Sequence, residues 1–140
     1  MTFILDTNVV SEIAARRPNP QVVGWLTARD VSETFLSVIS IAEIRRGIAL
    51  LLDVEKRIRL EFWFEAQVLG AFDGRILPVD RAIAELCGRF VAERQRTGRP
   101  IEPFDAMIAA TAEVHGLILV TRNVRDFAGW GGRTFNPWEP

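Results

Sequence analysis

Short apolar runs that alternate with longer helical patterns constrain the fold of this chain more than any other feature. Apolar residues at helical spacing fill most of the segments between the runs. Strands that alternate with helices favour a mostly parallel sheet covered by helices on both faces. The sequence therefore predicts a three-layer α/β/α fold with four or five strands. The expected strands are Phe3–Leu5, Thr34–Val38, Arg75–Val79 and Leu117–Thr121, with Arg133–Phe135 as a short fifth candidate.

Helix boundaries are marked by polar caps, prolines and glycines. Thr7 or Asn8 is expected to cap the first helix, and Asn19 the second, with Pro20 at its first position. Gly98 and Gly116 suit the ends of two later helices. The expected helices cover Val9–Ala15, a segment from Pro20, Ser40–Leu51, Val54–Ala71, a segment from Asp80 to Gly98, and Phe104–Gly116.

Length, charge and cysteine content narrow the class of protein. The 140 residues suffice for one domain with a substantial core, so we expect a single domain over residues 1–140. A formal net charge of −1 disfavours a protein that coats nucleic acid nonspecifically. The single cysteine excludes an internal disulfide, and no apolar run is long enough to span a bilayer. Since only four residues separate Met1 from Asp6, no signal peptide is expected, and we predict a cytoplasmic enzyme or binding protein.

Four acidic residues fall where the expected strands and helices meet. Asp6 follows the first strand and Glu43 lies in the first turn of the helix after the second, while Asp105 begins the helix before the fourth strand and Asp126 follows that strand. Because the carboxyl ends of parallel strands share one edge of the sheet, we expect these side chains to converge there. Such a cluster without a nearby lysine is costly unless a divalent cation neutralises it. Carboxylate oxygens favour Mg²⁺, with Mn²⁺ as the alternative.

Each of these acids also has a purely structural explanation. Asp6 could belong to the turn that caps the first helix, and Asp105 suits the positive end of a helix dipole. Glu43 follows Ser40 at the spacing of a capping box, in which it would bind the Ser40 amide. Asp126 could serve another helix start. Four independent caps need not surround one crevice, so a common edge favours a shared site.

Several segments together resemble one protein family. FILDTNVVSE, SVISIAEIRRG, PFDAMIAATAEVHGLILVTRNVRDF and the terminal FNPW resemble the PIN-domain toxins of bacterial toxin–antitoxin pairs, the VapC family and especially its FitB-like branch. The resemblance spans essentially the whole chain, with the blocks in the family's order. It implies a PIN domain and a metal-dependent endoribonuclease that leaves a 5′-phosphate and a 3′-hydroxyl. It places the catalytic acids on Asp6, Glu43, Asp105 and Asp126.

Roles within the site follow from the resemblance and from the chemistry of phosphodiester hydrolysis. We expect Asp6 and Asp105 to contact the metal directly, and Glu43 and Asp126 to act through water or a second ion. Arg45 and Arg46 are candidate phosphate contacts, or ordinary solvated helix residues. The implied partners are a VapB-like or FitA-like antitoxin, an RNA substrate and a second copy of the chain. The supporting polar residues are Thr7, Asn8, Thr121 and Asn123.

Two other functions compete with this interpretation. A phosphatase of the haloacid dehalogenase type also begins with an aspartate after the first strand, but it needs a second one at Asn8 and a lysine near the site. The only lysine, Lys56, is expected in a helix remote from any strand end. A catalytically silent PIN-like RNA-binding module would not need its carboxylates. Among the adjacent aromatics Phe62, Trp63 and Phe64, some must face the core, and the remainder could form a groove for a partner.

Overall fold

Five parallel strands form the centre of the molecule. The computed structural model describes residues 1–140, and the sheet has the order β3-β2-β1-β4-β5. Every neighbouring pair of strands is parallel, which confirms the predicted α/β class. All strand carboxyl ends therefore lie on one edge. The strands are β1 (Phe3–Leu5), β2 (Thr34–Ser37), β3 (Ile76–Leu77), β4 (Ile118–Val120) and β5 (Thr134–Phe135).

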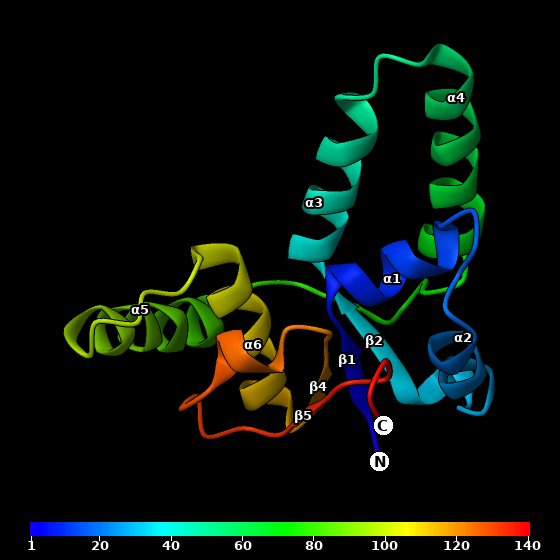
Figure 1. The fold of residues 1–140 in the computed structure, drawn as a ribbon. Coiled ribbons are helices and arrows are strands. Elements are labelled where there is room, and N and C mark those ends of the chain that lie inside the picture. Colours follow the sequence, from blue (N-terminus) through cyan, green and yellow to red (C-terminus); the bar gives the residue numbers. More distant parts are fainter.

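The alternation of side chains along the strands divides the core into two. Successive strand residues point to opposite faces of the sheet, so Ile4 packs on one face while Phe3 and Leu5 pack on the other. The Ile4 face is covered by α5 (Arg81–Arg96) and α6 (Pro103–His115). The opposite face is covered by α1 (Thr7–Ala14), α2 (Pro20–Thr27) and α3 (Val38–Ala49). Figure 1 shows the two helical groups on either side of the strands, which gives the three predicted layers.

Helices α3 and α4 (Val54–Trp63) form a hairpin that rises from the body of the molecule above α1 (Figure 1). A wider π-helical segment, η2 (Phe64–Leu69), continues α4, so the predicted helix over Val54–Ala71 is correct in extent but not uniform. The three consecutive aromatic residues differ in burial, because adjacent positions on a helix face different directions. Phe64 is fully buried, Trp63 is half-buried and Phe62 is 77% exposed.

Two predicted boundaries are wrong for a shared reason. Helix α1 begins at Thr7 because Asp6 itself is the cap, its Oδ1 accepting from the Thr7 amide at 2.8 Å. Helix α3 begins at Val38, a residue predicted to end the second strand, because the Ser37 hydroxyl accepts from the Ile39 amide. In both places the strand passes directly into a helix without a loop. None of the helices combines the length and apolarity needed to cross a membrane.

Candidate active site

The carboxyl edge of the sheet contains a switch point between β1 and β4. From β1 the chain passes to β2 and β3 on one side of the sheet, and then crosses to β4 and β5 on the other. In parallel α/β sheets, ligands bind where the strand order reverses in this way. Asp6 directly follows β1 and Thr121 directly follows β4. The topology therefore places both side chains at the position where a ligand is expected.

Asp6 is held at the base of this crevice by three donors. Its exposed fraction is only 4%, and its carboxylate accepts from the Thr7 amide, the Thr121 hydroxyl (2.7 Å) and the Asn8 side-chain amide (3.4 Å). Burial raises the pKa of Asp6, although the bonds from Thr121 and Thr7 oppose that increase. Only one of these three donors contacts Oδ1, so this oxygen keeps a lone pair for a ligand.

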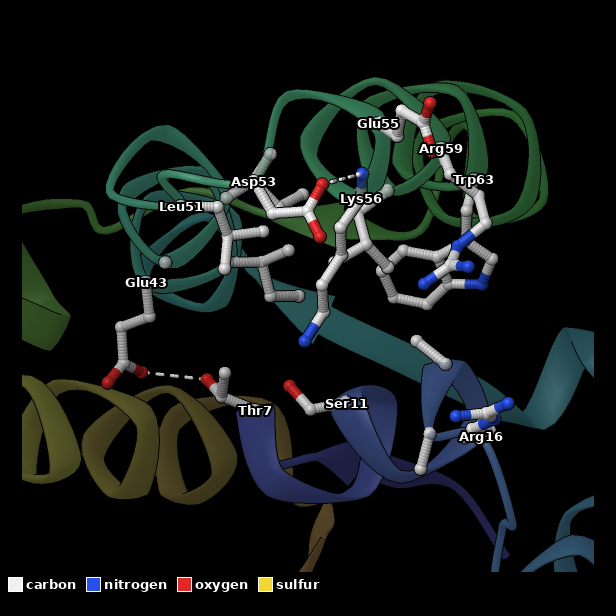
Figure 2. Close-up of a pocket in the computed structure, with 16 residues that line it drawn as sticks. Thr7, Ser11, Arg16, Glu43, Leu51, Asp53, Glu55, Lys56, Arg59 and Trp63 are labelled. Atoms are coloured by element: carbon white, nitrogen blue, oxygen red, sulfur yellow. Dashed lines mark hydrogen bonds between the residues drawn. The ribbon is translucent and has the colours of Figure 1, made fainter.

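Glu43 reaches the same crevice from α3. Its Oε1 accepts from the Thr7 hydroxyl at 2.7 Å (Figure 2). The same hydroxyl oxygen lies 2.9 Å from Ser40 Oγ. The capping-box explanation of Glu43 is therefore wrong. Helix α3 is capped by Ser37, which leaves Ser40 buried inside the helix and puts Glu43 in the second turn instead of the first. Burial is the main cause that raises the pKa of Glu43, and the charge of Asp6 adds to it.

Asp105 shows most clearly how crowded the negative charges are. It lies in the first turn of α6, half-buried, and its pKa is raised from 3.8 to about 7. Burial is the largest cause, followed by the charges of Asp6, Glu43, Glu102 and Asp126. A helix N-terminus alone would lower this pKa, so burial and the neighbouring negative charges together outweigh the dipole. None of the four predicted acids forms an ion pair.

Asp126 lies at the rim of the crevice. It is exposed, on the short 3₁₀ segment η3 (Val124–Phe127), and its charge still raises the pKa values of Asp6 and Asp105. The buried guanidinium of Arg94 holds this segment by donating to the carbonyl oxygens of Asp126 (2.7 Å) and Ala128 (3.4 Å). The charges of Asp6, Glu43 and Asp126 thus all act on Asp105, and Glu43 and Asp105 line the same small hollow.

The supporting residues form a hydrogen-bonded frame around Asp6. The Thr121 hydroxyl, which donates to Asp6, accepts from the backbone amide of Asn123 (3.0 Å) and from the Asn8 side chain (3.4 Å). Thr7 links Asp6 to Glu43, since its amide binds one carboxylate and its hydroxyl the other. Of the predicted set, Asn123 contributes through its backbone amide.

The two candidate phosphate contacts differ in their surroundings. Arg45 pairs with Glu65 at 3.0 Å and lies over the Phe64 ring, so its guanidinium already has partners. Arg46 forms no ion pair, and its charge lowers the pKa of Glu43. It lines a small hollow of about 390 Å³ beside Asp105. Arg46 is therefore the better placed of the two to meet a phosphate.

Sequence reasoning missed two features of the site. Glu102 lines the hollow and raises the pKa values of both Glu43 and Asp105. Its position three residues before Asp105, one helical turn away, was a usable signal. Lys56 lies in a helix as expected, but the α3–α4 hairpin places it on the wall of a groove that is also lined by Thr7 and Glu43 (Figure 2). Sequence distance from the strand ends gave no sign of that approach.

The donor set of the crevice fits a divalent cation. Its oxygen donors are carboxylates that raise one another's pKa values, and Arg46, the basic side chain beside them, forms no ion pair with them. Oxygen ligands of this kind suit hard metal ions. No three acidic side chains are already close enough to form a ready-made metal cluster. The fit therefore rests on the chemistry of the donors and on their mutual repulsion.

Similarity to known proteins agrees with the class of protein that the fold indicates. The chain belongs to the PIN domain family, whose model matches residues 3–129. Within this family it groups with the ribonuclease toxins named FitB and VapC. The family, the fold and the ribonuclease class predicted from sequence are thereby confirmed, and the dehalogenase-type phosphatase is excluded. Ribonucleases with this domain use a divalent metal ion.

Three matches illustrate the similarity. Toxin FitB of Neisseria gonorrhoeae is 39% identical over 136 residues, which cover 97% of this chain and 98% of the relative. VapC ribonuclease Y4jK of Sinorhizobium fredii is 36% identical, with 99% of each chain covered. The crystal structure of FitAcB from N. gonorrhoeae superposes with a TM-score of 0.93 at 38% identity, covering 99% of this chain and 100% of the other. Further structural neighbours are toxin–antitoxin complexes.

Proposed function

We propose that this protein is a Mg²⁺-dependent endoribonuclease, with Mn²⁺ as an alternative ion, and the toxin of a type II toxin–antitoxin pair. The observation that carries the proposal is the set of acidic side chains at the switch point, where burial and the charges of neighbouring carboxylates together raise the pKa of Asp105 to about 7. A substrate phosphate adds further negative charge to this crevice. A site that repels its own carboxylates needs a cation before it can accept a phosphodiester.

The ion would be held by Asp6 and Asp105 directly, and by Glu43 and Asp126 through water or a second ion. A bound divalent cation lowers the pKa of coordinated water and offsets the charge that develops on the phosphate oxygens. Asp6 is fixed for this role because three donors set the orientation of its carboxylate. Asp105 is half-buried beside other negative charges, so a bound cation would offset those charges and stabilise its ionised form.

The remaining residues orient these groups and the substrate. Thr7 fixes Glu43 relative to Asp6, and Thr121 with Asn8 and Asn123 fixes Asp6 relative to β4. Arg46 is placed to contact the phosphate from the small hollow.

The partners and the location follow from the family. The proposed partner is a VapB-like or FitA-like antitoxin that obstructs the crevice, and the toxin forms a homodimer in the cytoplasm. Residues 1–140 act as one domain. The exposed aromatic ring of Phe62 and the half-buried ring of Trp63 on α4 offer apolar surface for such a partner.

Cleavage of a structured RNA by the purified protein tests the proposal. We expect cleavage with Mg²⁺, none with EDTA, and 5′-phosphate ends on the products. Asp6→Asn and Asp105→Asn should abolish cleavage while the variants remain folded by circular dichroism. RNA binding without cleavage under any of these conditions would support a silent RNA-binding module instead.

A further inference from the structure

A groove of about 1050 Å³ runs away from the carboxylates between α1, α3 and α4. Thr7 and Glu43, which share the 2.7 Å hydrogen bond of the active site, form one end of it (Figure 2). Arg16 and Trp63 also line it. Its volume reaches the upper limit of pockets that hold one small ligand. An RNA strand bound at the carboxylates would therefore continue into this groove.

Three basic side chains line the groove, and none of them is neutralised. Lys56 and Arg59 come from α4, and Arg16 follows the end of α1. Their charges have no ion-pair partner anywhere in the molecule. Figure 2 shows the Lys56 side chain reaching across the groove toward α1, and Arg59 directed into the same space. Unpaired cations on facing walls of one groove indicate an anionic occupant.

The acids that line the groove do not cancel these charges. Asp53 caps α4, its carboxylate accepting from the backbone amide of Lys56 at 3.1 Å. Glu55 directs its carboxylate away from the groove (Figure 2). Glu43 belongs to the active-site end. Beyond Glu43, three basic and two acidic side chains line the groove, which leaves an excess of one positive charge.

The spacing along α4 gives this helix one face suited to nucleic acid. Lys56, Arg59 and Trp63 lie three and four residues apart, so they share one side of the helix. Basic groups contact backbone phosphates, and an aromatic ring offers a surface on which a base can stack. Trp63 is half-buried, with part of its side chain lining the groove.

We propose that this groove binds a single strand of RNA on one side of the cleaved bond, with Lys56 and Arg59 contacting backbone phosphates and Arg16 extending the track. The inference rests on the proposed ribonuclease function and adds to it the path of the substrate. The cations act as positioning residues, because they hold the strand while the carboxylates carry the reaction. Their removal should weaken substrate binding and leave the chemical step intact.

The test compares Lys56→Gln, Arg59→Gln and the double variant with Arg89→Gln. Arg89 is an exposed arginine on α5, outside the groove and without an ion pair, so it controls for the loss of one positive charge. Binding is measured by fluorescence anisotropy with a labelled single-stranded RNA of about 16 random nucleotides, in the Asp6→Asn background. Cleavage kinetics use the same groove variants with Asp6 intact.

We expect the double variant to raise Kd and KM about tenfold with kcat nearly unchanged, and Arg89→Gln to change neither. The dependence of log affinity on log salt should become shallower by about 0.7 for each lost phosphate contact, since the probe is a single strand. Equal effects of all the substitutions, or an unchanged salt dependence, would overturn the proposal. Loss of antitoxin binding with RNA affinity intact would also overturn it and would assign the groove to a protein segment. If wild-type protein cleaves no RNA with Mg²⁺, the proposed function itself fails, which is a separate result.

Discussion

Replacing Asp105 by asparagine should stabilise the metal-free protein above neutral pH. The folded-state pKa of Asp105 is raised from 3.8 to about 7, so the folded protein holds this proton more tightly than the unfolded chain does. Metal-free stability should therefore fall as pH rises from about 4 to about 7, and the loss should be complete above that range. Asparagine has nearly the same shape and carries no charge, so it avoids this loss.

The magnitude follows from the size of the pKa change and the exposure of the side chain. A change of this size corresponds to about 4 kcal/mol as an upper limit. Asp105 is only half-buried, and solvent screens its interactions with the other carboxylates. We therefore expect Asp105→Asn to raise the free energy of unfolding by about 1 to 2 kcal/mol at a pH of about 8. The difference should nearly vanish below a pH of about 4.5.

Urea unfolding in EDTA, followed by circular dichroism at several pH values, measures this effect. Asp73→Asn is a suitable control because Asp73 is exposed and precedes β3, at the amino edge of the sheet and away from the site. With Mg²⁺ the order should reverse, since only the wild-type protein keeps the full ligand set, and bound metal stabilises the folded state. A variant equally or less stable than wild type in EDTA at high pH would refute the crowding argument.

Three further predictions concern groups that support the site or the core. Thr7→Val should lower kcat at least about tenfold with little loss of fold, because Glu43 loses its fixed donor; Thr7→Ser should restore activity, and equal rates for all three proteins would exclude this role. Arg94→Lys should reduce cleavage and lower the urea midpoint, because an ammonium group cannot reproduce the guanidinium contacts to the loop that carries the fourth carboxylate. Phe64→Ala should cost about 3 to 5 kcal/mol in unfolding free energy, whereas Phe62→Ala should cost less than about 1 kcal/mol; similar costs would contradict their assigned positions.

The layers of the fold and the gathering of the acids could be predicted because they depend on local patterns. Apolar runs marked four strands, with Arg133–Phe135 as a candidate for the fifth, and the parallel arrangement then placed Asp6 and Asp105 at one edge. It was harder to predict that Ser37, and not Ser40, caps α3. Both serines precede helical residues, and only the immediate passage from strand to helix decides between them.

Contacts that depend on how helices pack could not be predicted from the sequence. Lys56 is thirteen residues from Glu43 and belongs to another helix, yet the α3–α4 hairpin folds them into the same groove. Phe64 and Val68, which follow α4, are buried in the same core cluster as Phe3 and Leu36 of the sheet. The buried guanidinium of Arg94 is a similar case, because its acceptors are carbonyl oxygens, which carry no sequence signature.

The central claim is that the crowded carboxylates at the end of β1 hold a divalent ion. Mn²⁺ binding to the purified protein, followed by the electron paramagnetic resonance signal of the free ion, tests this claim without relying on activity. The wild-type protein should bind Mn²⁺, and Mg²⁺ should compete for the same site. Asp6→Asn should weaken binding at least about tenfold, since it removes the charge of the most fixed carboxylate. Equal Mn²⁺ affinity in the wild-type protein and Asp6→Asn would contradict the account.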